Sequence, residues 1–328
     1  MNPNYFIGPM SKNVVDAVLE FSNSHNAKMG LIPSRRQIDF NGGYVNKWTT
    51  KEFSNYVNFH QTAANILIER DHAGPMQGHV EDDGYDSMAH DVRCMDIIHI
   101  DPWKKYPIYE DGLHATIELI NHCKNIQPGI LFEVGTEESI RKFSAIELDK
   151  FLSDLKSILS NDTYNCIVYA VIQSGTSIKN TTQTGKYDRD RLVDMLDVCH
   201  NRGILSKEHN GDYMPIELIQ EKFKIGLDAI NIAPEFGNIE TETYLKNITD
   251  SPMFELFWLL CYSSNRWQKW VDINFDPHSQ KYELIQVCGH YVFSNPLFVN
   301  YIKNQLPDID NKIKIKLTEK LNELYAIV

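Results

Sequence analysis

The segment at residues 66–75, ILIERDHAGP, decides how the rest of the chain is interpreted. It begins like a buried strand, with apolar and β-branched residues, and Gly74 and Pro75 punctuate its end. Between these two parts stand four ionisable side chains, Glu69, Arg70, Asp71 and His72. Such a strand end is either a set of salt bridges or a reaction centre, and the other strand ends bear on that choice.

Similar short apolar runs recur along the chain, and segments such as GLHATIELINHCK between them carry apolar residues at helical spacing. With a first strand at residues 5–7, these runs make eight β/α units. Eight alternating units predict a closed (β/α)8 TIM barrel, while a doubly wound open sheet would suit the seven clearer units. The seven runs are AKMGLIP (27–33), NILIERD (65–71), DIIHID (96–101), GILFEVG (129–135), NCIVYAVIQ (165–173), RGILSKEH (202–209) and DAINIAP (228–234).

The composition changes after about residue 250, where aromatic-rich helical segments such as SPMFELFWLLCYSSNRWQKWV (251–271) begin. We therefore predict a barrel over residues 1–249 and a helical extension over residues 250–328 that packs on it. This extension could take part in a subunit contact.

Bulk properties exclude several classes of function. A formal charge of −12 argues against a nucleic-acid partner, because such affinity is built from clustered Lys and Arg. A small anionic substrate remains possible, because a few local cations are enough to bind it.

The six scattered cysteines predict reduced thiols and a cytoplasmic protein. No signal-peptide pattern is present, and the longest apolar stretch falls short of the ~20 residues that span a bilayer, so we expect no membrane role.

The polar residues gather at the carboxyl ends of the predicted strands, which is where barrel active sites form. If the strand extends that far, alternation places Glu69 and Asp71 on one face and Arg70 and His72 on the other. Because the segment AGP (73–75) ends the strand there, we expect His72 to lie in the turn, where it can swing over the barrel mouth. An Asp beside a His can combine a proton donor with a metal ligand, as a metal-assisted carbon–carbon lyase requires. Alternatively, Asp71 caps a helix and His72 is an ordinary loop residue.

Other strand ends supply His99 with Asp101, Glu133, and His209. Imidazole and carboxylate groups together suit a divalent metal such as Zn²⁺, with about three protein ligands and one open position. His99 could instead be a core histidine bonded to a backbone carbonyl. We predict a site with metal ligands His72, His99, Glu133 and His209, and catalytic residues Asp71, Asp101 and Glu133.

Three further features point to substrate binding or to other chemistry. Arg35 and Arg36 could clamp a phosphate or carboxylate. The loop SGTSIKNTTQTGK (174–186), which contains Lys179, could cradle a phosphate or simply be a polar loop. Lys207 permits a Schiff-base mechanism, although a lysine there more often pairs with a carboxylate such as Glu69.

The order of these motifs resembles the accessory-subunit family of class II tagatose-bisphosphate aldolases, whose members are also labelled tagatose 6-phosphate kinases. The resemblance covers nearly the whole chain and rests on short segments: RRQIDFNGGY (35–44), TTKEF (49–53), RDHAGP (70–75), IHID (98–101), VGTEE (134–138), EHNGDY (208–213), RWQKW (266–270) and NPLFVNYIKNQL (295–306).

That family is similar to the catalytic class II aldolases, which are zinc-dependent (β/α)8 barrels. The resemblance implies that Asp71 is the proton-transfer acid, that His72 and His209 bind zinc, that Glu133 lies near the metal and that Asn231 contacts substrate. The candidate substrate-binding residues are Arg35, Arg36, Gln37, Gln173, Ser174, Lys179, Asp212 and Asn231.

Two departures from the class II pattern bear on the substrate. Gln173 stands where those enzymes have another zinc-binding histidine. The segment after His209 reads NGDY instead of a glycine/serine phosphate loop, and Glu235 follows the last strand, where it would repel a phosphate. A bisphosphate substrate is therefore in doubt.

Two functions from different classes follow. The first is a metal-dependent, class II aldolase-like lyase that acts on a sugar or sugar-phosphate carbonyl compound. The second is a non-catalytic subunit that stabilises a separate aldolase, which predicts a poorly formed metal site and an apolar surface near residues 250–270. The chain could also be a homo-oligomer. A sugar kinase has no residue support, since no Walker-type phosphate loop is present.

Overall fold

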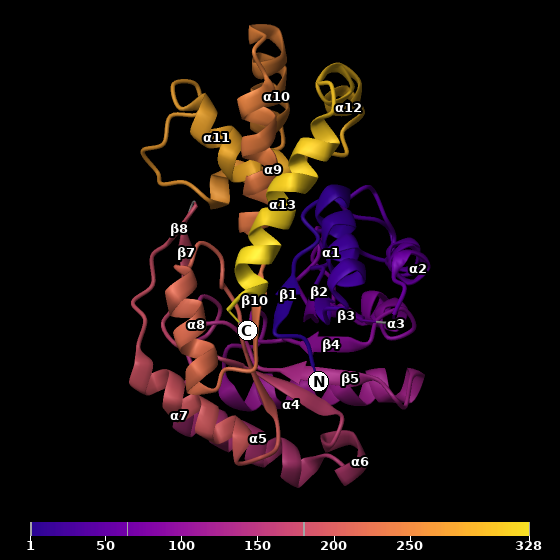
Figure 1. Cartoon of the computed structure of the whole chain (residues 1–328). Coiled ribbons are helices and arrows are strands. Elements are labelled where there is room, and N and C mark those ends of the chain that lie inside the picture. Colours follow the sequence, from indigo (N-terminus) through magenta and orange to yellow (C-terminus); the bar gives the residue numbers. More distant parts are fainter. Residues whose placement is uncertain (1, 64, 180, 328) are drawn as a thin grey trace.

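Eight parallel strands close into a barrel in the computed structural model, which describes residues 2–63, 65–179 and 181–327 (Figure 1). Neighbouring strands follow the order β1-β10-β9-β6-β5-β4-β3-β2. All eight predicted strands are present, which confirms the TIM barrel and excludes the doubly wound sheet. The strands are β1 (Tyr5–Ile7), β2 (Met29–Leu31), β3 (Ile66–Ala73), β4 (Ile97–Ile100), β5 (Leu131–Val134), β6 (Ile167–Ile172), β9 (Leu205–Glu208) and β10 (Ala229–Ile232).

Amphipathic helices cover the outside of the barrel. Helix α1 shows why they form: Ser11 caps its first turn by accepting a hydrogen bond from Val14 N–H, and its valines and leucine face the core. A small hairpin, β7 (Ile178–Lys179) with β8 (Thr182–Gln183), interrupts the loop after β6. The helices of this layer are α1 (Lys12–His25), α2 (Thr50–His60), α3 (Tyr85–Asp91), α4 (Tyr109–Ile126), α5 (Ala145–Ile158), α6 (Asn161–Tyr164), α7 (Arg189–His200), α8 (Ile216–Ile225) and α9 (Pro234–Asn247).

The chain after α9 is helical, as predicted. Helices α10 (Ser251–Ser263), α11 (Lys281–Cys288) and α12 (Pro296–Tyr301) stand beyond one end of the barrel, whereas α13 (Ile309–Tyr325) runs back beside α1 (Figure 1). The Tyr5 hydroxyl of β1 donates to the carbonyl of Leu324 in α13 at 2.8 Å. The last helix thus completes the outer layer of the barrel. A domain boundary at residues 249/250 stays a prediction.

Two predictions from composition can be compared with the structure. All six cysteines are free, and four of them are buried. Among the described residues, no helix is both long enough and apolar enough to cross a bilayer.

A buried ion cluster lies inside the barrel. Lys207 of β9 is fully buried, and its ammonium group pairs with Glu69 of β3 and, at 2.7 Å, with Glu133 of β5. The rings of Phe6 and Tyr169 lie 3.9 and 4.7 Å from the same ammonium. The predicted pairing of Lys207 with Glu69 is therefore confirmed, and the cluster ties three strands together.

Candidate active site and metal centre

A β-bulge in β3 builds the site. Arg70 pairs with Ile98 and Ala73 with Ile100, so Asp71 and His72 together oppose the single residue His99 of β4. His72 has φ +47°, a left-handed conformation that is rare for non-glycine residues and frequent near functional sites. His72 reaches the barrel mouth as expected, but it lies within β3 and not in a turn. The bulge interrupts the alternation that would have placed Asp71 and His72 on opposite faces, so both side chains face the same cavity.

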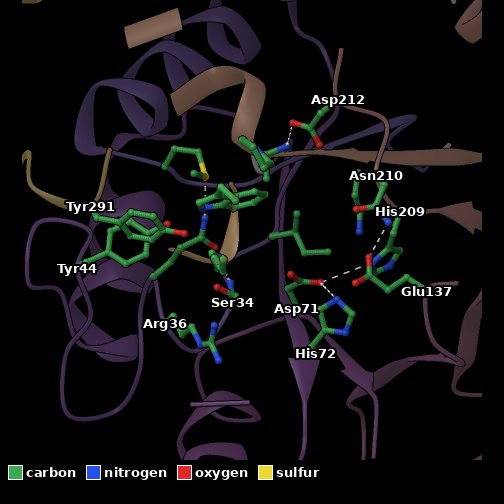
Figure 2. A pocket seen from close by; sticks show the side chains of 18 residues that line it. Ser34, Arg36, Tyr44, Asp71, His72, Glu137, His209, Asn210, Asp212 and Tyr291 are labelled. Atoms are coloured by element: carbon green, nitrogen blue, oxygen red, sulfur yellow. Dashed lines mark hydrogen bonds and ion pairs between the residues drawn. The ribbon is translucent and has the colours of Figure 1, made fainter. Parts of the chain in front are cut away.

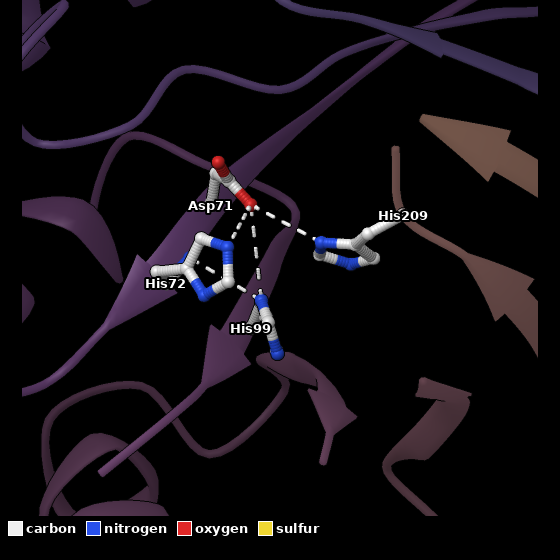
Figure 3. A group of neighbouring side chains, drawn as sticks. All are labelled: Asp71, His72, His99 and His209. Carbon is white, nitrogen blue, oxygen red and sulfur yellow. Dashed lines mark hydrogen bonds and ion pairs between the residues drawn. The ribbon is translucent and has the colours of Figure 1, made fainter. Parts of the chain in front are cut away.

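Four side chains converge at the carboxyl ends of three strands (Figure 3). One ligand atom each from Asp71, His72, His99 and His209 lies within 4.8 Å of the others. Asp71 Oδ1 lies 3.5 Å from His72 Nε2, 3.9 Å from His99 Nδ1 and 3.8 Å from His209 Nδ1. This oxygen is buried and has no hydrogen-bond partner among the described residues.

Each histidine is held from behind through its other ring nitrogen. His72 Nδ1 lies 2.5 Å from Asp101, His209 Nε2 lies 3.1 Å from Glu133, and His99 Nε2 lies 3.1 Å from the Gly135 carbonyl. These groups accept hydrogen bonds, so in a neutral imidazole they favour a proton on the outer nitrogen, the one that contacts them. The inner nitrogen, which faces Asp71, then carries the lone pair that can bind a metal. Metal-binding histidines are oriented in this way.

His99 has features of both roles predicted for it, a metal ligand and a core histidine bonded to a backbone carbonyl. It is fully buried and bonds to a backbone carbonyl, as a core histidine would. Its inner nitrogen also faces Asp71, although that nitrogen accepts a hydrogen bond from the His72 backbone N–H at 3.2 Å. His72 and His209 have no such competing contact among the described residues, so they are the better placed ligands.

The charges of the cluster support one another. Burial would raise the pKa of Asp71, but the neighbouring charges of His72 and His209 outweigh it and hold the pKa well below its usual range. Burial would lower the pKa of His72, but Asp71 and Asp101 raise it to about 10. Without a metal, an ionised Asp71 therefore sits against a protonated imidazole.

The four ligand atoms fit a small divalent cation. Tetrahedral zinc with bonds of about 2.0–2.1 Å keeps its ligand atoms roughly 3.3 Å apart. The three separations from Asp71 Oδ1, 3.5–3.9 Å, are only slightly longer than this. The three imidazole nitrogens form a donor set that suits zinc and leave its fourth position open, so Asp71 would lie beside such an ion as a candidate proton acceptor. The unpartnered Asp71 oxygen faces the space that such an ion would occupy.

Asp101 and Glu133 lie behind the histidines and do not line the cavity. Glu133 is engaged by both Lys207 and His209. Burial would raise its pKa, but the charge of Lys207 outweighs burial and holds the pKa well below its usual range. The structure does not bring Glu133 into the group of four ligand atoms, and it gives Asp101 and Glu133 the contacts of positioning residues.

A cavity of about 260 Å³ opens over the cluster (Figure 2). The predicted residues Arg36, Gln37, Asp212 and Asn231 line it. Asn231 Oδ1 is buried with no hydrogen-bond partner among the described residues. Sequence reasoning missed several further lining residues, among them Tyr44, Glu137, Asn210, Lys269, Trp270 and Tyr291. The RWQKW motif was the available signal for two of them, but nothing local showed that it folds over the barrel mouth.

Four predicted substrate-binding residues lie outside the cavity, because other groups in the fold use their polar atoms. Arg35 is buried against Asp39 and Asp82, and Lys179 pairs with Asp272 at the surface. The Gln173 amide bonds the backbone of the loop after β5, and the Ser174 hydroxyl joins a buried pair formed by Lys222 and Glu208.

Two chemical arguments from the sequence also change. Glu235, expected to repel a phosphate, pairs with Lys320 of α13 at 2.9 Å and does not line the cavity. Lys207, the Schiff-base candidate, is enclosed by two carboxylates. Burial would lower its pKa, but Glu133 and Glu69 raise it above its ordinary value. A permanently charged, enclosed ammonium is a poor nucleophile, which disfavours the Schiff-base mechanism.

Comparison with known proteins identifies the architecture. No protein-family model matches the chain, and no curated protein matches it in sequence. A probable tagatose 6 phosphate kinase from Sinorhizobium meliloti 1021 matches 100% of both chains at 13% identity and a TM-score of 0.77. The YdjI aldolase from Escherichia coli K12 matches 99% of this chain and 90% of its own at 10% identity and a TM-score of 0.62.

A fructose-bisphosphate aldolase from Campylobacter jejuni covers 99% of this chain and 89% of its own at 11% identity, with a TM-score of 0.62. The chain has the fold of these aldolases. The neighbours carry the two kinds of name, tagatose 6-phosphate kinase and aldolase, that the resemblance in the sequence predicted. At these identities the likeness establishes the fold alone.

Proposed function

We propose that this protein is a divalent-metal-dependent, aldolase-like carbon–carbon lyase that acts on a sugar-type carbonyl compound. The observation that carries the proposal is the convergence of Asp71 with the inner nitrogens of His72, His99 and His209, each histidine being held from behind. We propose zinc as the metal, because imidazole ligands suit it.

The residues divide the work of a retro-aldol cleavage. His72 and His209, with His99 beside them, would hold a divalent cation, which would supply the Lewis acidity that polarises a carbonyl group and stabilises the charge developing on its oxygen. Asp71, kept ionised, accepts the proton of the substrate hydroxyl as the carbon–carbon bond breaks. Asn231 presents an unpartnered amide oxygen to the substrate. Asp101 and Glu133 keep two of the imidazoles in position.

Elemental analysis of purified protein tests the metal centre. We expect close to one divalent metal ion per chain in the wild type, and loss of that metal in His72→Ala and in His209→Ala. A matched control is His114→Ala, since His114 is an exposed histidine on α4 and should leave the metal content unchanged. A retro-aldol screen with ketoses and ketose phosphates follows. Folded wild-type protein that contains no metal as purified and takes up none when zinc is added would contradict the proposal.

A non-catalytic subunit that stabilises a separate aldolase is the second candidate, and the surface of α10 favours it. Most residues of this helix are apolar; Phe257 and Cys261 are buried, and six others pack against the core but stay partly exposed. Leu259 is 49% exposed, and Ile273 after the helix is 99% exposed. Exposed apolar surface of this kind marks a protein contact. A partner aldolase or a second copy of the chain would cover it.

Sedimentation of the wild type and of Leu259→Glu separates the two candidates. If α10 serves only assembly, the variant lowers the assembled mass and keeps the metal content. If the protein is solely an accessory subunit, the wild type is metal-free, and it forms a complex with an aldolase that Leu259→Glu prevents.

A further inference from the structure

The cavity has two chemically different sides. In Figure 2, Asp71, His72 and His209 lie on one side, and Arg36, Tyr44 and Tyr291 lie on the other. The first side holds the candidate metal ligands. The second side belongs to the loop after β2 and to the C-terminal extension.

The second side carries cations without matching anions. Arg36 donates only a long hydrogen bond, 3.4 Å, to the Gly78 carbonyl, and Lys269 lines the cavity beside it. Among the described residues, no carboxylate lies within ion-pair distance of either group. In a chain with a net charge of −12, two unpaired cations that face one cavity are unusual, because carboxylates are abundant elsewhere on the surface.

Aromatic rings fix the direction of Lys269. Its ammonium lies 4.2 Å from the centre of the Trp270 ring and 5.5 Å from that of Tyr291. Desolvation by the surrounding groups and the charges of Arg36 and Arg266 together lower the pKa of Lys269 to about 8, against an opposing effect of Glu137, although the side chain itself is exposed. The proximity of like charges costs free energy, which an anion placed between them would recover.

The rest of the cavity would not accept a second anion. Glu137 and Asp212 line it beyond β5 and β9, so an anionic group near those strands meets carboxylates. The cavity therefore suits a molecule with its carbonyl at the histidine cluster and a single oxyanion at the opposite end.

We propose that Arg36 and Lys269 bind one terminal oxyanion of the substrate, a phosphate or a carboxylate, so that the C-terminal extension helps to select the substrate. This inference rests on the proposed function for the identity of the reaction, but its binding test does not depend on it.

Calorimetric titration of the full-length chain with inorganic phosphate, and separately with acetate, tests the subsite. We expect saturable binding of at least one of these anions to the wild type, and the anion bound more tightly identifies the group. Loss of one charge-assisted hydrogen bond should weaken that binding at least about tenfold in Arg36→Gln and in Lys269→Met. Lys269→Arg keeps the charge and should retain binding. Lys316→Met removes an exposed cation from α13 and should change nothing.

The same titrations on His209→Ala separate this inference from the proposed function. If the protein binds no metal but the anion results hold, only the proposed chemistry fails. Equal affinities in the wild type, Arg36→Gln and Lys269→Met would overturn the subsite, as would the absence of saturable binding of either anion. Where the retro-aldol screen finds a substrate, the same two variants should raise KM for oxyanion-bearing substrates at least about tenfold, with a much smaller change in kcat.

Discussion

The barrel contains two clusters of ionisable side chains, one inside it and one at its mouth. Inside, the Lys207 ammonium forms ion pairs with both Glu69 and Glu133, although Glu69 Oε1 has no hydrogen-bond partner among the described residues and burial raises the pKa of Glu69 well above its usual range. At the mouth, Asp71 faces inner histidine nitrogens at 3.5–3.9 Å and has an oxygen with no hydrogen-bond partner among the described residues. The difference teaches that charge at a strand end is a weak signal, because a lysine of the chain can occupy the point where the acids meet, whereas imidazole and carboxylate ligand atoms that face one point without such a lysine are a stronger signal.

The largest effect should come from breaking the inner cluster. Lys207→Met leaves two buried carboxylates without a cation, and we expect a loss of about 3–5 kcal/mol in the free energy of unfolding. Denaturant titration of the metal-free protein measures it. Lys316→Met, at an exposed pair, should cost less than about 1 kcal/mol. A loss for Lys207→Met as small as that of the control would mean that the inner cluster contributes nothing to stability.

The mouth cluster should respond to pH instead. Its histidines must be neutral to bind metal, and Asp71 and Asp101 overcome burial to raise the pKa of His72 to about 10. Below that value metal binding displaces a proton, so affinity should rise roughly tenfold per pH unit from neutral pH toward pH 10. Zinc titration against a competing chelator checks it. A flat profile between pH 7 and 9 would show that His72 is neutral before metal binds.

Removal of one residue that holds a histidine should have a smaller effect on the mouth cluster. Asp101→Ala frees His72 Nδ1, and such changes behind a ligand cost about 10–100-fold in metal affinity. The measurement belongs above about pH 10, where His72 is mostly neutral and proton competition is weak. The folded structure should persist, as judged by circular dichroism. Unchanged affinity would argue that His72 is held by the backbone bulge alone.

The smallest effect should come from a candidate that the structure removes from the site. Lys179 pairs with Asp272 at the surface, so Lys179→Met should change stability by less than about 1 kcal/mol and leave metal and anion binding unchanged. Calorimetric titrations of the variant with zinc and with phosphate provide the comparison. A weakened phosphate affinity would return the loop after β6 to the substrate site.

The order of strands and helices could be predicted because hydrophobic periodicity is a local property. Each strand run is apolar and ends in Gly, Pro or polar residues, and the helical segments show their own spacing. The ends of β3, β4 and β9 therefore indicated Asp71, His72, His99 and His209 before any coordinates were known. The alternation of side chains between the two faces of β3 did not hold after Arg70. A β-bulge interrupts it there, and the two-residue repeat of a regular strand does not predict a bulge.

The sequence by itself determined that eight β/α units alternate and that acids and histidines gather at their carboxyl ends, because both follow from residue type and spacing along the chain. Only the tertiary structure decided which polar atoms remain available. Glu133, Gln173, Ser174 and Lys179 are engaged by partners more than 25 residues away in the chain. Lys269 reaches the cavity because the extension folds over the barrel mouth. Long-range packing settles such competition, and no local pattern records it.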